Sequence, residues 1–182
     1  MKTRPILFST PMVQAILTGN KTQTRRIVKP PYSTYPAVTK HITSCEFDFH
    51  YPDRIGQYTK SPYGKPGDQL WVRETWVWEG DTSWKDLMPL GSFFYKADFE
   101  EYEGPTKWKP SIFMPREASR ITLEITNIRV ERLQDISYKD AKAEGVEYPH
   151  DFCKLWEAIN GIESWIENPW VWIIEFKKLD ES

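Results

Sequence analysis

The stretch Ser119-Arg-Ile-Thr-Leu-Glu-Ile-Thr-Asn-Ile-Arg-Val-Glu-Arg-Leu133 carries the clearest structural signal in the chain. Its apolar residues Ile121, Leu123 and Ile125 alternate with polar ones, which is the period of a strand with one buried face. The alternation shifts by one residue at Asn127, and such a shift indicates a β-bulge. We therefore predict one long, bulged strand over residues 119–133.

Two predicted strands and a helix precede this stretch. Ile6-Leu7-Phe8 is a short apolar run typical of a strand. Thr10-Pro11 has the pattern of an N-cap followed by proline at the first helical position, so we predict a short helix that ends at Gly19. The segment 70–78 is rich in Trp and Val and predicts a further strand.

Two helices and a strand are predicted after it. Ser137 has the position of an N-cap for a short helix that ends at Gly145. The apolar residues of segment 151–160 follow helical spacing and predict an amphipathic helix. The apolar run from Trp170 to Phe176 predicts a buried closing strand.

The segments 30–66 and 79–118 carry few periodic signals. The first is rich in Pro, Tyr and Ser, and we predict both to be long irregular inserts, with a hairpin near Phe93-Phe94-Tyr95 in the second. Few βαβ repeats are visible elsewhere. The pattern favours a single α+β domain over residues 1–182, built as a small barrel of about five or six strands with short flanking helices.

Composition narrows the class of protein. The chain has 182 residues, of which 9 are Trp, 9 Tyr and 9 Phe, and this aromatic content excludes disorder as the main state. No apolar stretch approaches the roughly 20 residues that cross a bilayer. The two Cys residues and the absence of a signal-peptide pattern favour a cytoplasmic protein without a membrane partner.

Charge is concentrated near the start of the chain. Residues 1–45 hold seven Lys or Arg residues and no Asp or Glu, although the whole chain has a net charge of −2. The densest point is the segment 21–29. Such asymmetry favours a focused site for an anionic partner, and the competing interpretation is a solvated loop balanced by acidic neighbours.

The basic segment contains the pattern Gly19-x-Lys21-x-x-Thr24-x-Arg26. The neighbouring Arg residues favour the neutral form of Lys21, because like charges lower the pKa of an amine. A neutral Lys21 can act as a base toward the Thr24 hydroxyl. The two side chains face each other if the segment turns, and they diverge if it is extended.

Three motifs in order resemble the ASCH superfamily, in particular its phage and prophage branch. They are Gly19-Asn-Lys-Thr-Gln-Thr-Arg-Arg26, Gly67-Asp-Gln-Leu-Trp-Val-Arg-Glu74 and the closing Trp172-Ile-Ile-Glu-Phe-Lys-Lys-Leu179. The resemblance implies a PUA-like β-barrel, a role in RNA binding, and no metal or cofactor. It covers most of the chain, apart from the details of the two inserts.

The resemblance also implies a chemistry. Some small ASCH proteins are amidohydrolases that cleave the acyl amide of N4-acetylcytidine with a Lys, a Thr and a Glu. Lys21 and Thr24 match the first two, and Glu144 matches the third, with Glu74 as the rival acid. Lys21 would take the Thr24 proton, Thr24 would attack the carbonyl, and Glu144 would protonate the leaving amine. This chain is longer than those enzymes, so the inserts are expected to reshape the pocket.

Two other functions compete with an enzyme. The first is a non-catalytic module that binds RNA or single-stranded nucleic acid. Lys21, Arg25 and Arg26 would then grip phosphates, and insert aromatics would stack on bases; the candidates are Tyr32, Tyr35, Tyr58, Tyr63, Trp84 and Trp108. The second is a phage assembly or host-interaction protein with a Trp-rich interface.

The remaining candidate residues are weaker. Arg116 and Arg120 precede the long strand and are expected at the surface or at additional phosphate contacts, and Arg73 beside Glu74 predicts a strand-edge ion pair or a binding contact. The pairs His41/Cys45 and His150/Cys153 have spacings compatible with zinc. Nothing in the sequence brings these pairs together, so we expect no metal site.

Overall fold

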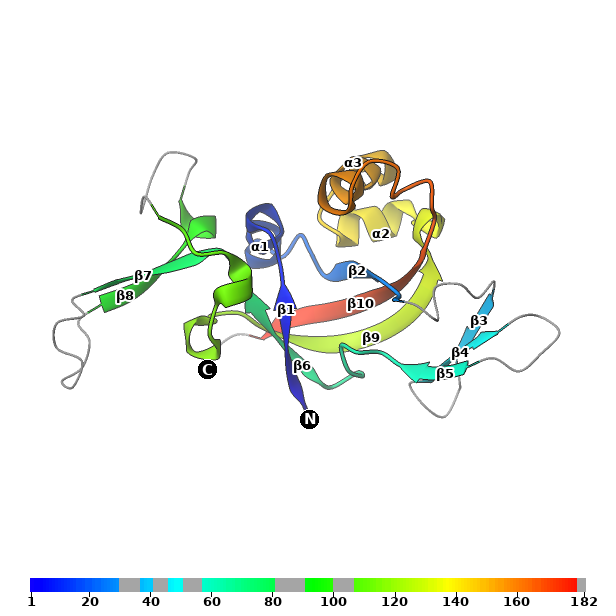
Figure 1. Cartoon of the computed structure of the whole chain (residues 1–182), viewed down its shortest axis with the longest axis horizontal. Helices are drawn as coiled ribbons and strands as arrows, with labels where there is room; N and C mark the ends of the chain where they lie inside the picture. The colour runs from blue at the N-terminus through cyan, green and yellow to red at the C-terminus, as the bar shows by residue number, and fades with distance from the viewer. Residues whose placement is uncertain (30–36, 41–45, 51–56, 81–90, 100–106, 180–182) are drawn as a thin grey trace.

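A five-stranded sheet forms the body of the protein in a computed structural model, which describes residues 1–29, 37–40, 46–50, 57–80, 91–99 and 107–179. Its strands, in spatial order, are β1 (Thr3–Leu7), β6 (Gln69–Arg73), β9 (Thr122–Arg132), β10 (Trp170–Leu179) and β2 (Gln23–Ile27) (Figure 1). β1 and β6 are parallel, and the other neighbours are antiparallel. The predicted α+β class is confirmed.

The long strand predicted from the alternating pattern is β9, and its bulge is confirmed. Ile125 is opposite Phe176 of β10, whereas Asn127 is opposite Glu175, so Thr126 between them has no partner in the register. The extra residue shifts the side-chain alternation. Ile128 is therefore buried as well as Ile125, and the strand stays apolar toward the core on both sides of the bulge.

The three predicted helices are present as α1 (Thr10–Leu17), α2 (Tyr138–Ala143) and α3 (Pro149–Asn160). The predicted N-cap of α1 is one residue too late, because Ser9 is the extended capping residue and Thr10 is already helical. Ser137 caps α2 as predicted: its hydroxyl accepts from the backbone N–H of Asp140, and the Asp140 side chain bonds back to Ser137.

Helices α2 and α3 cover one face of the closing strand β10, and aromatic residues of β4 cover the other. In Figure 1, α2 and α3 lie together over the end of the sheet that contains β2 and β10. They cover Val171 and Ile173, one face of β10. Trp172, on the opposite face of β10, packs against Phe47 and Phe49. β10 is therefore buried on both faces, as its apolar run predicted.

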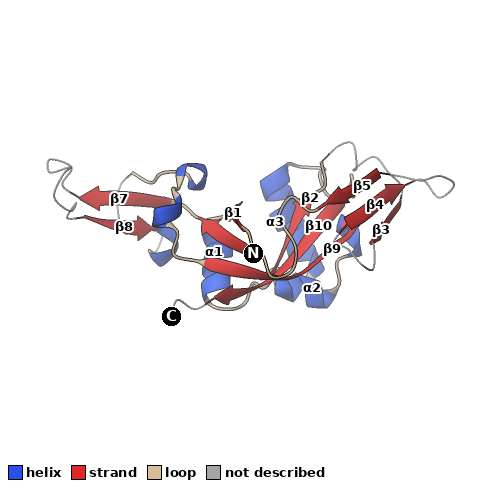
Figure 2. Cartoon of the chain, turned by 90° about the horizontal axis from the view of Figure 1, so that it is seen from below, coloured by secondary structure: helices blue, strands red, loops and turns tan. Residues whose placement is uncertain are grey.

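The two inserts contain regular structure that the sequence pattern missed. A three-stranded sheet is made of β3 (Ala37–Lys40), β4 (Glu46–His50) and β5 (Gln57–Lys60), and a hairpin is made of β7 (Trp76–Gly80) and β8 (Gly91–Tyr95). Figures 1 and 2 show them at opposite ends of the molecule. The prediction of irregular inserts is wrong for these residues, although the hairpin near 93–95 is confirmed. The short strands were obscured by the surrounding Pro residues.

The single strand predicted over residues 70–78 is two strands. β6 ends at Arg73 and β7 begins at Trp76, where the chain leaves the five-stranded sheet and pairs with β8 instead of β9. Glu74, at the break, has a buried side chain that bonds to Arg120 rather than facing solvent. A Trp- and Val-rich run continues through the break, so periodicity alone does not reveal the change of partner.

The edges of the five-stranded sheet are linked by a side chain rather than by strand pairing. Among the described strands no register joins β1 to β2, which are the two edges. Arg26 of β2 spans this opening, because its Nη2 donates to the carbonyl of Leu7 at the end of β1 at 2.7 Å. Its guanidinium also lies over the Phe8 ring, 5.1 Å from the centroid.

Within the described residues, no helix has the length and apolar character needed to cross a bilayer.

Candidate functional site

A cavity of about 610 Å³ lies between the β1–α1 connection, β2 and α3. This is the size of a pocket for a small organic ligand. Its apolar walls include Phe8, Met12, Tyr63, Phe152, Trp156 and Ile159. Its polar lining includes Thr24, Arg25, Arg26, Lys29 and Glu144. The basic segment singled out in the sequence therefore forms one side of a largely apolar cavity.

Lys21 and Glu144 form a buried ion pair beneath this cavity. The Lys21 Nζ donates to Glu144 Oε2 at 2.7 Å and to the Glu144 carbonyl at 2.8 Å, and the two backbones also pair in an isolated β-bridge. Gly145 makes the close approach feasible, because α2 ends there at φ +89° and a Cβ would lie 3.1 Å from that of Ala15. The helix end thus positions Glu144 on Lys21.

Arg25 supplies a second cation to the same carboxylate. Its Nη1 donates to Glu144 Oε1 at 3.1 Å, so each carboxylate oxygen accepts from a different positive group. The Arg25 side chain is fully buried; its Nη2 lies 3.7 Å from Asp140 and 3.9 Å from Glu131. The Glu144 carboxylate is consequently surrounded by charge and held in one orientation.

Thr24 and Arg26 form a separate pair at the cavity wall. Arg26 Nη1 donates to Thr24 Oγ1 at 2.6 Å and to the Arg25 carbonyl at 3.0 Å. Because a guanidinium has no acceptor, the Thr24 oxygen accepts this bond and its own hydrogen remains available for donation. A charged donor at 2.6 Å also favours the ionised form of the hydroxyl.

Burial lowers the pKa of the Lys21 amine below its ordinary value. The charge of Glu144 and its hydrogen bond oppose this change, while Arg26 and Arg25 lower the pKa further. The sequence argument attributed a lowered pKa to the Arg neighbours; the direction agrees, but burial is the larger cause. Burial also lowers the pKa of Arg26, against the opposing effects of Tyr63 and Glu144.

The structure brings together most, but not all, of the predicted catalytic residues. Lys21 and Glu144 are in contact, and Thr24 and Glu144 line the same cavity. Within the described residues, the side-chain hydrogen bonds of Lys21 Nζ go to Glu144 and not to Thr24. The basic segment enters β2 and is extended from Gln23, so it favours the arrangement in which Lys21 and Thr24 diverge over the turn that would bring them face to face.

Glu74, the rival acid, belongs to a different ion pair. Arg120 holds both of its oxygens, from Nε at 3.0 Å and from Nη2 at 3.1 Å. Burial raises the Glu74 pKa, Arg120 opposes this, and Asp98 adds to it. Glu74 does not line the cavity, so Glu144 is the candidate acid that both lines it and bonds to Lys21.

The other predicted binding arginines also lie away from the cavity. Arg73 and Arg116 have their guanidinium groups 5.4 and 5.7 Å from the centroid of the Trp71 ring, and Arg73 donates to the Ile112 carbonyl. Arg120 is occupied by Glu74 and Asp98. None of the three lines the cavity. The prediction that they bind the same ligand as Lys21 therefore finds no support in their placement.

Only one of the insert aromatics reaches the cavity in the described part of the chain. Tyr63 lines it, and Trp108 packs on Phe99 with ring centroids 5.7 Å apart. Tyr32, Tyr35 and Trp84 lie outside the described residues, and nothing is stated about the side chain of Tyr58. No Trp is among the exposed large hydrophobic residues of the described ranges, but four are half-buried, so the Trp-rich interface stays a prediction; they are Trp71, Trp78, Trp108 and Trp165.

Trp156 is a cavity residue that the sequence indicated only as core. It is 5% exposed, and its indole N–H has no hydrogen-bond partner among the described residues. Of the candidate zinc residues, His41 and Cys45 lie outside the described residues, and His150 Nε2 lies 3.1 Å from Asp151 Oδ1. In the described ranges no group of three or more His, Cys, Asp or Glu residues has the geometry of a metal site.

Comparison with known proteins identifies no family. No family model matches the sequence, and no curated protein matches it. A crystal structure of hypothetical protein PH0355 aligns with 98% of this chain and 100% of its own, at 12% identity and a TM-score of 0.46. A crystal structure of protein EF3133 from Enterococcus faecalis V583, described with family-model DUF984, aligns with 99% of this chain and 81% of its own, at 10% identity and a TM-score of 0.45.

Proposed function

We propose that this protein is an ASCH-type amidohydrolase that removes the acyl group from an acylated pyrimidine base, with N4-acetylcytidine as the representative substrate. One observation carries the proposal. Thr24 and Glu144 line one cavity, and Glu144 is paired there with a buried lysine whose pKa is lowered. A hydroxyl, a base of reduced pKa and an acid next to one pocket are the groups that acyl transfer requires.

The first half of the reaction transfers the acyl group to Thr24. The ion pair first becomes neutral as the Lys21 proton passes to Glu144 along their hydrogen bond. The Lys21 amine then accepts the Thr24 proton as Oγ1 attacks the acyl carbonyl, and Arg26 stabilises the charge that develops on Oγ1. The transfer requires Nζ to exchange its bond to the Glu144 carbonyl for one to Thr24. Glu144 then gives its proton to the exocyclic amine as the C–N bond breaks, which restores the Lys21–Glu144 ion pair.

The second half regenerates the enzyme. Water attacks the acyl-Thr24 ester, the Lys21–Glu144 pair accepts its proton, and the carboxylic acid leaves as Thr24 recovers its hydrogen. The base is released before this step. The aromatic rings of Phe152, Trp156 and Tyr63 provide faces on which a pyrimidine can stack.

The burial of Lys21 and Arg25 favours this proposal over phosphate binding by these two residues. Lys21 and Arg25 are each 2% exposed and are paired with carboxylates, so they present no cationic surface to a nucleic-acid backbone. An electrostatic surface for nucleic acid needs accessible Lys and Arg side chains. The burial of these two side chains supports a role inside the cavity over direct contact with a nucleic-acid backbone.

Release of cytidine from N4-acetylcytidine, followed by chromatography, tests the proposal. Thr24→Val removes the hydroxyl at nearly constant volume and should abolish turnover, whereas Thr24→Ser keeps the nucleophile and should retain part of it. Glu147→Gln serves as the matched control, because Glu147 is an exposed carboxylate three residues beyond Glu144. Absence of turnover in the wild-type protein, or full turnover in Thr24→Val, would overturn the proposal.

A further inference from the structure

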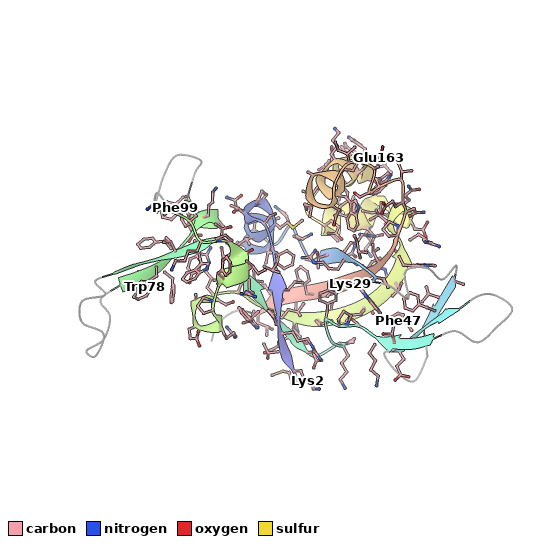
Figure 3. The ribbon with its side chains drawn as sticks, in the orientation of Figure 1. Lys2, Lys29, Phe47, Trp78, Phe99 and Glu163 are labelled. Carbon is pink, nitrogen blue, oxygen red and sulfur yellow. The ribbon has the colours of Figure 1, made fainter. Side chains whose placement is uncertain are left out.

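A second cavity of about 330 Å³ adjoins the proposed active site. The two share Ile27, Lys29 and Tyr63 as lining residues, and the second extends toward Lys60 and Trp172. Figure 3 labels Lys29 at the five-stranded sheet and Phe47 on β4 to its right. The two cavities therefore meet at a common wall that contains Lys29 and Tyr63.

The charge of Arg26, next to this junction, has no carboxylate partner among the described residues. Its guanidinium donates to three neutral oxygens: the Thr24 hydroxyl and the carbonyls of Arg25 and Leu7. Arg25 and Arg120, by contrast, are each paired with carboxylates. Removing a permanent cation from water is unfavourable unless an anion compensates it. The environment of Arg26 is therefore typical of a binding site in which the ligand supplies the anion.

Lys29 adds a second cation on the same wall. Its side chain is exposed and makes no hydrogen bond or ion pair with the described residues. Tyr63, which lines both cavities, is electrostatically coupled to Arg26 and carries a hydroxyl donor. Among the described residues, the one carboxylate that lines the first cavity is Glu144, which is already neutralised by two cations. The junction is therefore left with net positive charge.

We propose that the junction bounded by Arg26, Lys29 and Tyr63 binds a phosphate group, so that the substrate is an acylated nucleotide rather than a free nucleoside. The phosphate is either the terminal monoester of a mononucleotide or a diester within an RNA chain. The identity of the base rests on the proposed function, whereas the phosphate site does not depend on hydrolysis. Lys and Arg donors around a tetrahedral anion form strong charge-assisted hydrogen bonds.

Equilibrium binding of cytidine and cytidine 5′-monophosphate, followed by calorimetry, tests the phosphate site without any turnover. We expect the monophosphate to bind at least about tenfold more tightly, as charged hydrogen bonds of ordinary strength allow. Lys29→Gln should remove most of this advantage, so that binding of the monophosphate weakens much more than binding of cytidine. Lys154→Gln, an exposed lysine on α3 that lines neither cavity, should behave as wild type.

Two outcomes overturn the inference: equal affinity for cytidine and its monophosphate, or an equal loss for both ligands in Lys29→Gln. A short RNA that contains cytidine distinguishes the phosphate source, because tighter binding of the RNA assigns the diester and tighter binding of the mononucleotide assigns the monoester. Preference for the monophosphate without any hydrolysis supports the phosphate site and rejects the amidohydrolase. Hydrolysis of N4-acetylcytidine without this preference supports the enzyme and rejects the phosphate site.

Discussion

Replacing Glu144 by Gln should destabilise the protein strongly, because two buried cations depend on one carboxylate. The Glu144 side chain is 2% exposed and accepts from Lys21 at 2.7 Å and from Arg25 at 3.1 Å. Breaking a buried ion pair by removing one partner costs about 3–5 kcal/mol. Arg25 cannot lose its proton, but it retains Asp140 at 3.7 Å, so most of the loss falls on Lys21.

The loss at Lys21 has an upper limit that depends on pH. Deprotonating an amine with an ordinary pKa of 10.5 at pH 7 costs roughly 5 kcal/mol, because each pH unit corresponds to about 1.4 kcal/mol. An unpaired Lys21 can therefore become neutral at this cost instead of staying charged in the core. Burial already lowers the folded pKa of Lys21, and loss of Glu144 lowers it further. Between the folded and the unfolded pKa of Lys21, the unfolded state binds more protons than the folded state. The free energy of unfolding therefore rises with pH in this window.

Urea unfolding of the wild type, Glu144→Gln and the exposed control Glu147→Gln measures the effect. We expect a deficit of about 3–5 kcal/mol at pH 7 for Glu144→Gln and little change in the control. The deficit should narrow as pH rises between the Lys21 pKa of the variant and that of the wild type. Adding Lys21→Met to Glu144→Gln should recover stability, because it removes the unpaired amine. A deficit below about 1 kcal/mol, or one that grows with pH, would refute the buried pair.

Three further substitutions test other parts of the structure. Glu74→Gln should lower the free energy of unfolding by about 2–4 kcal/mol, because it breaks the ion pair with Arg120. Turnover of N4-acetylcytidine per folded molecule should stay unchanged, and a specific loss of turnover would show that Glu74 is part of the active site. Gly145→Ala should destabilise by about 1–2 kcal/mol, because φ is +89° there and Lys21 lies close, and thermal unfolding that matches wild type would contradict this. Asp140→Asn should weaken the cap of α2 by about 1 kcal/mol and reduce kcat more than KM; unchanged kinetics would show that it does not help to position the site.

Local patterns predicted the elements whose partners are close in sequence or whose burial follows a simple period. Alternation revealed β9 and its bulge, and the serine before residues 138–143 revealed α2 with its cap. The inserts were harder, because strands of four or five residues between prolines carry little periodic signal. The break at Glu74 was missed because an apolar run does not show which strand it pairs with.

The candidate site was only partly visible in the sequence. A buried strand that contains Arg25 contradicts ordinary hydrophobic patterning, and its explanation is a carboxylate 119 residues further along the chain. Glu144 on its own is an unpromising acid, since a helix C-terminus disfavours negative charge. Two cations from the start of the chain offset this. Resemblance to a family suggested the pairing of Lys21 with Glu144, whereas no local rule contains it.

Direct detection of an acyl-Thr24 intermediate tests the central claim most directly. The protein would be mixed with N4-acetylcytidine, quenched in acid at early times and analysed by intact and peptide mass spectrometry. The account predicts that one acetyl group appears on the peptide containing Thr24, that it decays as acetate forms, and that it is absent in Thr24→Val. Cytidine release without any acetylated Thr24, and at an undiminished rate in Thr24→Val, would contradict the assignment of Thr24 as the nucleophile of this cavity.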